Sequence, residues 1–139
     1  MIRIGLLVPS SNTVFENDVH ASLPRSQFTA HAARMHLVET TRDAEQVMLD
    51  HHAPAAASDL SALEPDLVLF GCTSAGSLGG MDHDREICEA LGRRAAAPCV
   101  GVLSAVSEAL VRRNWRRVVV TGAKPRARSC SRTKVRVGR

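Results

Sequence analysis

The stretch DLVLFGCTSAGS, residues 66–77, joins an apolar run to a cluster of small polar residues. Its first half is aliphatic and aromatic, as in a buried strand, and the run stops at Gly71. Cys72, Thr73 and Ser74 follow at once, so a thiol and two hydroxyls come directly after the strand. The pattern predicts a core strand with a candidate site at its carboxyl end.

Similar apolar runs recur along the chain and alternate with helical patterns. Strands are predicted at residues 2–8, 28–35, 66–70, 99–103 and 117–121. Helices are predicted at residues 12–23, 40–50, 55–63, 82–94 and 104–114, with an interruption at Pro54. Such alternation is typical of an α/β fold. We predict a three-layer lobe in which helices flank a mostly parallel sheet of four to five strands.

A second polar loop, PSSNT, follows the first predicted strand. Asn12 or Thr13 is predicted to cap the next helix, with Glu16, three or four residues on, as the capping partner. In parallel sheets, ligands bind beyond the carboxyl ends of the strands, where both polar loops are expected to lie. Ser10, Ser11 and Asn12 would offer side-chain donors there, as Thr73 and Ser74 would from the other loop.

These donors, together with the N–H groups of the small-residue turns, suit a carboxylate. Nearby N–H dipoles are expected to lower the pKa of Cys72 and to raise its thiolate fraction. A thiolate beside a carboxylate pocket can remove a proton from the neighbouring carbon or add to an activated double bond. The alternative is a buried cysteine that ends a strand, with hydroxyls that only satisfy the turn.

The other candidate residues favour structural roles. Cys88 and Cys99 are expected to be buried, and Cys130 lies in the tail. The sequence has no C-x-x-C pair and no zinc spacing, so no metal is predicted. His83 is interpreted as part of a charged helix start. No Gly-rich nucleotide motif occurs, so no cofactor is expected.

Charge divides the chain into a body and a tail. Seven of the 18 Lys and Arg residues lie in residues 122–139, while all 14 acidic residues lie in residues 1–121. We predict an N-terminal α/β domain over 1–121 and a basic, disordered tail over 122–139. Because no segment has the length of a membrane helix or the form of a signal peptide, a cytoplasmic protein is expected.

Two quoted motifs together suggest a family. IGLLVPSSNTVFEND, followed some sixty residues later by LVLFGCTSAGS, resembles the aspartate/glutamate racemase superfamily, and most closely its maleate cis–trans isomerase and arylmalonate decarboxylase branch. The resemblance covers residues 2–121. It implies one α/β lobe of a pseudo-twofold, two-lobed enzyme that needs no cofactor.

The resemblance also implies roles for individual residues. Cys72 matches the first-lobe cysteine, which in the isomerases adds to the substrate double bond. Thr73 and Ser74 match residues that hold a carboxylate, and Asn12 matches an asparagine of the first loop, with Ser10 and Ser11 beside it. Because the decarboxylases have glycine in place of the first cysteine, Cys72 favours an isomerase or a racemase.

The sequence departs from the family after residue 121, where the tail replaces the expected second lobe and its cysteine. The chain resembles a truncated first lobe, and its arginine-rich ending is of the kind that a shifted reading frame produces. Impaired activity is therefore expected, together with either poor solubility or compensating homo-oligomerisation.

Three functions compete. The first is a cofactor-independent isomerase or racemase of a small dicarboxylate or amino acid that uses Cys72; the second is a carboxylate-binding lobe without catalysis. The third is contact with nucleic acid through the basic tail. Scarce aromatic residues, 3% of the chain, make a base-stacking surface and hence a nucleic-acid partner unlikely. No membrane partner is expected.

Overall fold

The computed structural model describes residues 1–115, 117–120 and 133–136. The chain divides into two compact units, Met1–Ser104 and Ala105–Arg139. The first unit contains every residue predicted for the site. The second contains the end of helix α6 (Val102–Arg112) and a separate pair of strands.

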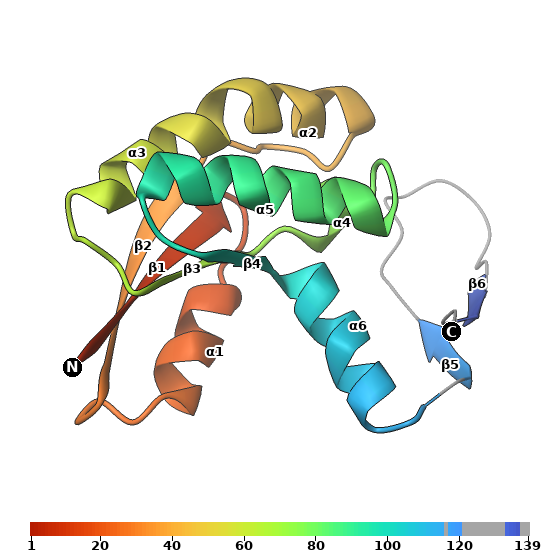
Figure 1. The fold of residues 1–139 in the computed structure, drawn as a ribbon. Helices are drawn as coiled ribbons and strands as arrows, with labels where there is room; N and C mark the ends of the chain where they lie inside the picture. Colours follow the sequence, from red (N-terminus) through yellow and green to blue (C-terminus); the bar gives the residue numbers. More distant parts are fainter. Residues whose placement is uncertain (116, 121–132, 137–139) are drawn as a thin grey trace. The chain divides into compact units, whose positions relative to one another are not determined.

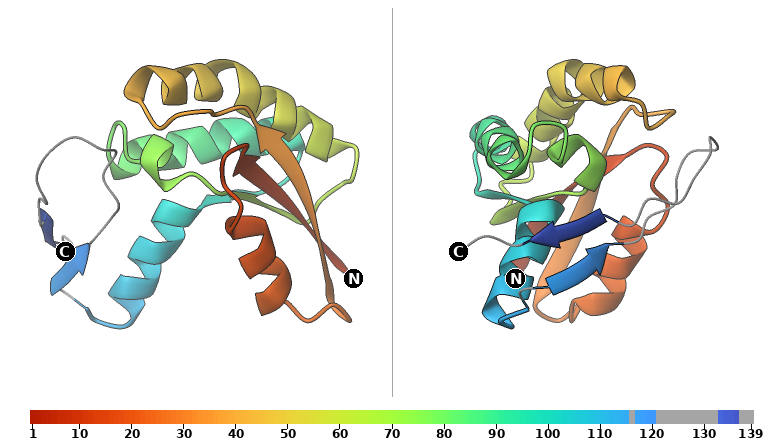
Figure 2. Two further views of the ribbon diagram at one scale, coloured as in Figure 1. Left: turned by 180° about the vertical axis from the view of Figure 1, so that it is seen from behind. Right: turned by 90° about the vertical axis from the view of Figure 1, so that its right-hand side faces the viewer.

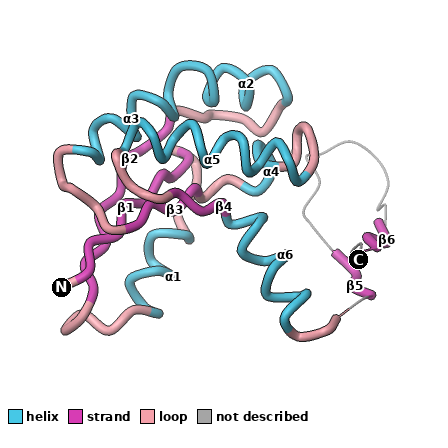
Figure 3. The backbone as a smooth tube through the Cα atoms, viewed as in Figure 1, coloured by secondary structure: helices cyan, strands magenta, loops and turns pink. Residues whose placement is uncertain are grey.

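A parallel four-stranded sheet forms the centre of the first unit (Figure 1 and Figure 3). Its order is β2 (Phe28–Met35), β1 (Ile2–Pro9), β3 (Leu67–Phe70) and β4 (Cys99–Gly101). The connecting helices are α1 (Phe15–Ser22), α2 (Arg42–Val47), α3 (Ala53–Ser61), α4 (Thr73–Gly76) and α5 (Met81–Ala95). The predicted α/β fold with a parallel sheet is confirmed.

Alternation along β1 produces two hydrophobic cores, one on each face of the sheet. Ile4, Leu6 and Val8 pack on the face that α1 covers, where Phe15 and Val19 contact them. The intervening Leu7 belongs to the opposite core, with residues of β3, α3 and α5. Figure 2 shows α1 on one side of the sheet and α3 and α5 on the other. Complete burial of each large aliphatic side chain contributes roughly 1.5–3 kcal/mol.

The helical segment after β2 runs on where the sequence predicted an interruption. A π-helical turn, η1 (Met48–His52), joins α2 directly to α3, and Pro54 lies in the first turn of α3. The N–H of Ala53 bonds to the carbonyl of Met48, five residues back. Proline lacks an N–H and its ring crowds the carbonyl four residues earlier, so a wider turn beside it lets the helix continue. The predicted break is therefore wrong.

The fifth predicted strand does not join the main sheet. β5 (Arg117–Val120) pairs in antiparallel fashion with β6 (Thr133–Arg136) in the second unit. β6 lies inside the range predicted to be a disordered tail, whereas residues 121–132 and 137–139 lie outside the described residues. The domain boundary at residue 121 and the disorder of the tail therefore stay predictions.

Within the described part of the chain, no helix is both long enough and apolar enough to cross a membrane.

Candidate active site

The ends of β1 and β3 bring the two predicted polar loops to the same edge of the sheet. These strands are parallel neighbours, with Leu7 opposite Phe70. The N–H of Gly71 donates to the carbonyl of Leu7 over 2.9 Å, which continues the pairing into the second loop. A Cβ atom on Gly71 would lie 2.5 Å from the Phe15 ring. Glycine at this position therefore lets the start of α1 approach the cysteine loop closely.

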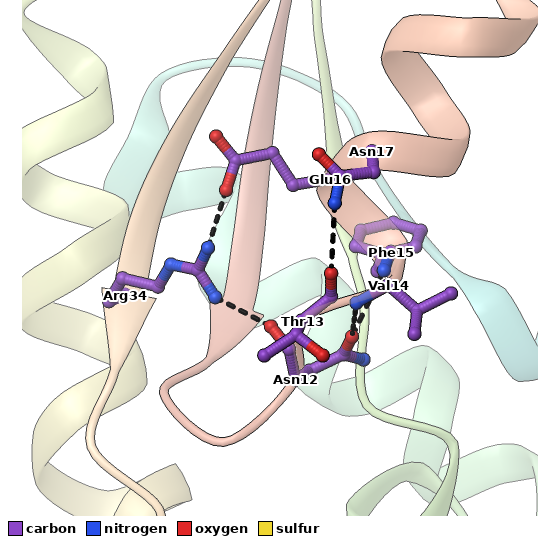
Figure 4. Close-up of polar contacts among 7 residues, drawn as sticks. All are labelled: Asn12, Thr13, Val14, Phe15, Glu16, Asn17 and Arg34. Carbon is purple, nitrogen blue, oxygen red and sulfur yellow. Dashed lines mark hydrogen bonds and ion pairs between the residues drawn. The ribbon is translucent and has the colours of Figure 1, made fainter.

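Val14 occupies the N-cap position of α1 and makes no side-chain cap bond, but the side chain of Asn12, two residues earlier, bonds to N–H groups at the start of the helix. The Oδ1 of Asn12 accepts hydrogen bonds from the N–H groups of Val14 and Phe15, each over 3.0 Å, as Figure 4 shows. Because these bonds occupy the oxygen, the Asn12 side chain has its NH₂ group to offer to a ligand. That group is a donor, which suits a carboxylate.

Glu16 is not the capping partner that the sequence predicted. The N–H of Asn12 bonds to the carbonyl of Pro9, and Glu16 instead forms an ion pair of 2.5 Å with Arg34 of β2. The other guanidinium nitrogen of Arg34 donates to the carbonyl of Asn12 over 2.7 Å (Figure 4). Arg34 thus ties the Asn12 loop to β2, a role visible only once the register places it opposite Val8.

Ser10 is exposed, but its hydroxyl is bonded within the loop. Its hydroxyl donates to the carbonyl of Leu37 over 3.1 Å and accepts from the N–H of Leu37 over 2.9 Å. Its own N–H bonds to the carbonyl of Met35. The hydroxyl proton is therefore used within the protein. Ser11, beside it, is exposed.

Cys72 directly precedes the short helix α4 and is only 6% exposed. Its Sγ lies 3.6 Å from the Oγ of Ser74. Burial raises the pKa of the Cys72 thiol, while N–H groups of Ala75 and Ser74 and the Ser74 hydroxyl act in the opposite direction. Negative charge on Glu45 raises this pKa further. The predicted dipole effect is present, but burial outweighs it.

The remaining predicted residues fall into two groups. Ser74 is half-buried beside the sulfur, whereas Thr73 is exposed. Among the described residues, no direct hydrogen bond joins the Asn12 side chain to Cys72 or Ser74, so a ligand would have to bridge the two loops. A surface hollow of about 580 Å³ lies elsewhere, lined by residues of α1 and β2 that include Asn17, His20 and His31.

The other described cysteines are structural. Cys88 is buried and Cys99 half-buried, and both are free. Two causes raise the pKa of Cys88: the larger is a hydrogen bond to Cys99, and the next is burial. Cys88 therefore stays a thiol. His83 lies 3.9 Å from Glu86 on the surface of α5, as its interpretation predicted. Cys130 lies outside the described residues.

Sequence reasoning missed two buried carboxylates close to the candidate site. Asp84 of α5 is fully buried, and its Oδ2 accepts hydrogen bonds from the N–H and hydroxyl of Ser104. A Cβ atom on either Gly76 or Gly101 would overlap this carboxylate. Glu45 of α2 is 3% exposed. Glu45 lies three residues before the buried Met48, so a helical pattern aligned on Met48 would have placed Glu45 on the inner face of the helix.

The chain is similar in sequence to maleate isomerases. It is 30% identical over 121 residues to the enzyme of Pseudomonas putida, and this match covers 79% of the chain and 48% of the relative. It is 34% identical over 77 residues to the enzyme of Geobacillus stearothermophilus, which covers 50% of the chain and 30% of that relative. The chain therefore spans at most about half the length of these curated relatives. No protein-family model matches it.

Solved structures show the same fold. A maleate cis–trans isomerase of Nocardia farcinica superposes with a TM-score of 0.70 at 24% identity, covering 80% of this chain and 48% of that one. A liganded variant of arylmalonate decarboxylase superposes with a TM-score of 0.70 at 19% identity, covering 84% and 48%. The chain resembles half of a maleate isomerase. The family resemblance predicted from the two sequence motifs is thereby confirmed.

A third structure bears on the chemistry of these relatives. It is a cysteine-to-serine variant of the Nocardia farcinica maleate isomerase that holds a covalently bound succinylcysteine intermediate. It superposes with a TM-score of 0.68 at 23% identity and covers 79% of this chain and 48% of that one. The relatives of this half-length chain are thus enzymes, and one of them forms a bond between a cysteine and a four-carbon diacid.

Proposed function

We propose that the chain is one lobe of a cofactor-independent cis–trans isomerase that acts on a small dicarboxylate through Cys72. The observation that carries the proposal is the position of Cys72, which follows β3 at the sheet edge where the Asn12 loop follows β1. The similarity to maleate isomerases and the succinylcysteine in one of them support the same chemistry.

In the proposed reaction, Cys72 adds to one alkene carbon of the cis diacid. A sulfur electron pair forms the C–S bond, and the π electrons move to the other carbon and into its carboxylate. The former double bond can then rotate as a single bond. Return of the electron pair breaks the C–S bond and releases the trans diacid, so the reaction needs no oxidant, reductant or cofactor.

The neighbouring residues would hold the substrate carboxylates. The NH₂ group of Asn12 is a donor on one side, and the Thr73 hydroxyl and the N–H groups at the start of α4 are donors on the other. Fixed donors of this kind stabilise negative charge where it develops on the substrate. Ser10 supports the loop through Leu37, and the exposed hydroxyl of Ser11 is a further candidate donor.

A carboxylate-binding lobe without catalysis is the second candidate, and the burial of Cys72 favours it. A sulfur that is 6% exposed and whose pKa is raised is mostly a thiol at neutral pH. Such a lobe would bind a dicarboxylate equally well after replacement of Cys72. A racemase or decarboxylase reaction at the same site would instead use the sulfur as an acid or base.

Several features remain predictions from the sequence. They are impaired activity in a chain of half the relatives' length, a homo-oligomeric state, a cytoplasmic location, and a small dicarboxylate or amino acid as the substrate. Neither a membrane nor nucleic acid is expected to bind.

Conversion of maleate to fumarate, followed by proton NMR, tests the proposal. The wild-type chain is expected to produce fumarate, however slowly, and Cys72→Ser to produce none. Cys99→Ala, which removes a thiol distant from the loops, should retain the wild-type rate. Equal rates in wild type and Cys72→Ser would overturn the role of Cys72, and saturable maleate binding without conversion would favour the binding lobe.

A further inference from the structure

Asp84 is a fully buried carboxylate that the proposed reaction does not use. It lies in the first turn of α5, and its Oδ2 accepts hydrogen bonds from the N–H of Ser104, over 3.2 Å, and from the Ser104 hydroxyl. Ser104 belongs to the first turn of α6, where N–H groups have no partner within the helix and the helix dipole favours a negative group. These bonds account for one oxygen of the carboxylate.

The other oxygen, Oδ1, is buried without a hydrogen-bond partner among the described residues. Two glycines enclose the carboxylate instead. A Cβ atom on Gly76, the last residue of α4, would overlap Oδ1, and a Cβ atom on Gly101, at the end of β4, would overlap both oxygens. Because a buried oxygen without a donor is costly, its close contact with these two segments points to a role other than stability.

Gly76 connects this carboxylate to Cys72. The N–H of Gly76 donates to the carbonyl of Cys72 over 3.1 Å, which closes the single turn of α4. The Cys72 sulfur lies at the start of the same turn, 3.6 Å from the Oγ of Ser74. A helix of one turn has too few hydrogen bonds to hold its conformation alone. Contact with Asp84 at its end therefore helps to fix where the turn lies, and with it the groups around the sulfur.

We propose that Asp84 is a positioning residue for the cysteine loop: its carboxylate, held by Ser104, contacts Gly76 and fixes α4 so that Cys72 stays buried at the edge of the sheet. Through Gly101 the same side chain contacts the end of β4, which gives α4 a fixed place beside that strand. The meaning for catalysis rests on the proposed function, because the start of α4 also offers the N–H groups that would hold a substrate carboxylate.

The test measures the rate at which iodoacetamide alkylates Cys72 at alkaline pH, with the labelled peptides quantified by mass spectrometry and Cys88 followed in the same samples. Asp84→Ala removes the contact with Gly76 and should raise the rate at Cys72 at least about fivefold, because α4 opens more readily. Asp84→Asn keeps the planar group and one acceptor for Ser104, so its rate should stay within about twofold of wild type. Both variants lose the charge, so the difference between them reports the shape of the side chain.

A second set of variants approaches the contact from α4 and keeps the test available if Asp84→Ala does not fold. Gly76→Ala retains the carboxylate but places a methyl group against Oδ1, so α4 must move and Cys72 should react several-fold faster. In the double variant Gly76→Ala/Asp84→Ala the methyl group meets no carboxylate, so the rate increase should be smaller than the product of the two single increases. Asp82→Ala, at an exposed position of the same turn of α5, is the matched control and should leave the rate within about twofold of wild type.

Three results would overturn the proposal. The first is an equal rate at Cys72 in Asp84→Ala and Asp84→Asn. The second is a rate increase in the double variant that equals the product of the single increases, because the two side chains would then act independently. The third is an increase at Cys88 as large as that at Cys72, because general loosening exposes both thiols.

The labelling needs no substrate, so its outcome is distinct from that of the maleate assay. Rates that follow the proposal in a chain that converts no maleate would retain the role of Asp84 and remove the proposed function. Fumarate production by wild type, together with unchanged labelling in Asp84→Ala and Gly76→Ala, would retain the function and remove the role of Asp84. If both hold, Asp84→Ala should raise the maleate concentration that half-protects Cys72, and Asp84→Asn should not.

Discussion

The two loops at the carboxyl edge of the sheet have opposite characters. The Asn12 loop lies at the surface and is held by polar contacts to Phe15, Leu37 and Arg34. In the Cys72 loop the cysteine itself is buried, although Thr73 is exposed, and apolar packing and a close glycine contact hold the cysteine in place. Polar residues in the first loop form hydrogen bonds within the protein and are also the candidate donors to a ligand. In the second loop, the reactive thiol is buried away from water. The comparison indicates that donors and nucleophile are positioned by different forces.

The largest predicted effect concerns the contact that joins the two loops. Gly71→Ala places a Cβ atom 2.5 Å from the Phe15 ring, so this overpacking should lower the free energy of unfolding by about 1–3 kcal/mol. Urea denaturation measures the change. The double variant Gly71→Ala/Phe15→Ala lacks the clash. Its loss of stability should therefore be smaller than the sum of the losses measured for the two single variants. Strict additivity would show that the loops are not in close contact.

Next in size is the cap at the start of α1. Asn12→Ala removes the acceptor for two N–H groups and should cost about 1 kcal/mol of stability, measured by the same denaturation. Asn12→Asp keeps the acceptor but replaces the NH₂ donor with a negative charge. It should therefore retain most of the stability and lose dicarboxylate binding in calorimetry. Tight maleate binding by Asn12→Asp would mean that the NH₂ group does not contact the ligand.

The buried loop should make stability depend on alkaline pH. Burial raises the pKa of Cys72 above the ordinary value of 9.0, so the folded state holds its proton more tightly than the unfolded chain. The resulting stability is fully present below about pH 9 and declines as the pH rises through the higher folded pKa. Cys72→Ala should show a shallower decline of the unfolding free energy above pH 9, although Cys88 leaves part of the slope. Parallel curves for the two proteins would contradict the burial effect.

The smallest effect is expected at the surface ion pair. Arg34→Met removes the contacts to Glu16 and to the carbonyl of Asn12, and should cost no more than about 1 kcal/mol because the pair is exposed to solvent. Salt should reduce the difference between the two proteins in thermal denaturation. A loss that is large and insensitive to salt would place Arg34 among the main supports of the first loop.

Local sequence was enough to predict the sheet and the position of both loops. The apolar runs at β1 and β3 end in proline or glycine, and Asn12 precedes a helix in the usual manner of a cap. What could not be predicted depends on contacts distant in sequence. The partner of Ser10 requires the alignment of Pro9 with Met35, and the pairing of β5 depends on residues thirteen or more positions away.

The protonation state of Cys72 was misjudged for the same reason. Small residues and N–H groups next to the cysteine are visible in the sequence, but the burial that outweighs them comes from the core cluster, which residues distant in sequence build. Glu45 belongs to a segment interpreted only as a helix, and its inward direction follows from the packing of α2 against α4. A neighbouring motif can thus predict a nucleophile without predicting its ionisation.

The central claim is that the Cys72 sulfur faces a site in which the Asn12 loop holds a carboxylate. The most direct measurement is the rate at which iodoacetamide labels Cys72 in the presence of increasing maleate, for the wild-type chain and for Asn12→Asp. Maleate should slow the labelling of wild-type Cys72 several-fold and in a saturable manner, should leave Cys88 unaffected, and should give no protection in Asn12→Asp. Labelling of wild-type Cys72 that does not respond to maleate would contradict the account.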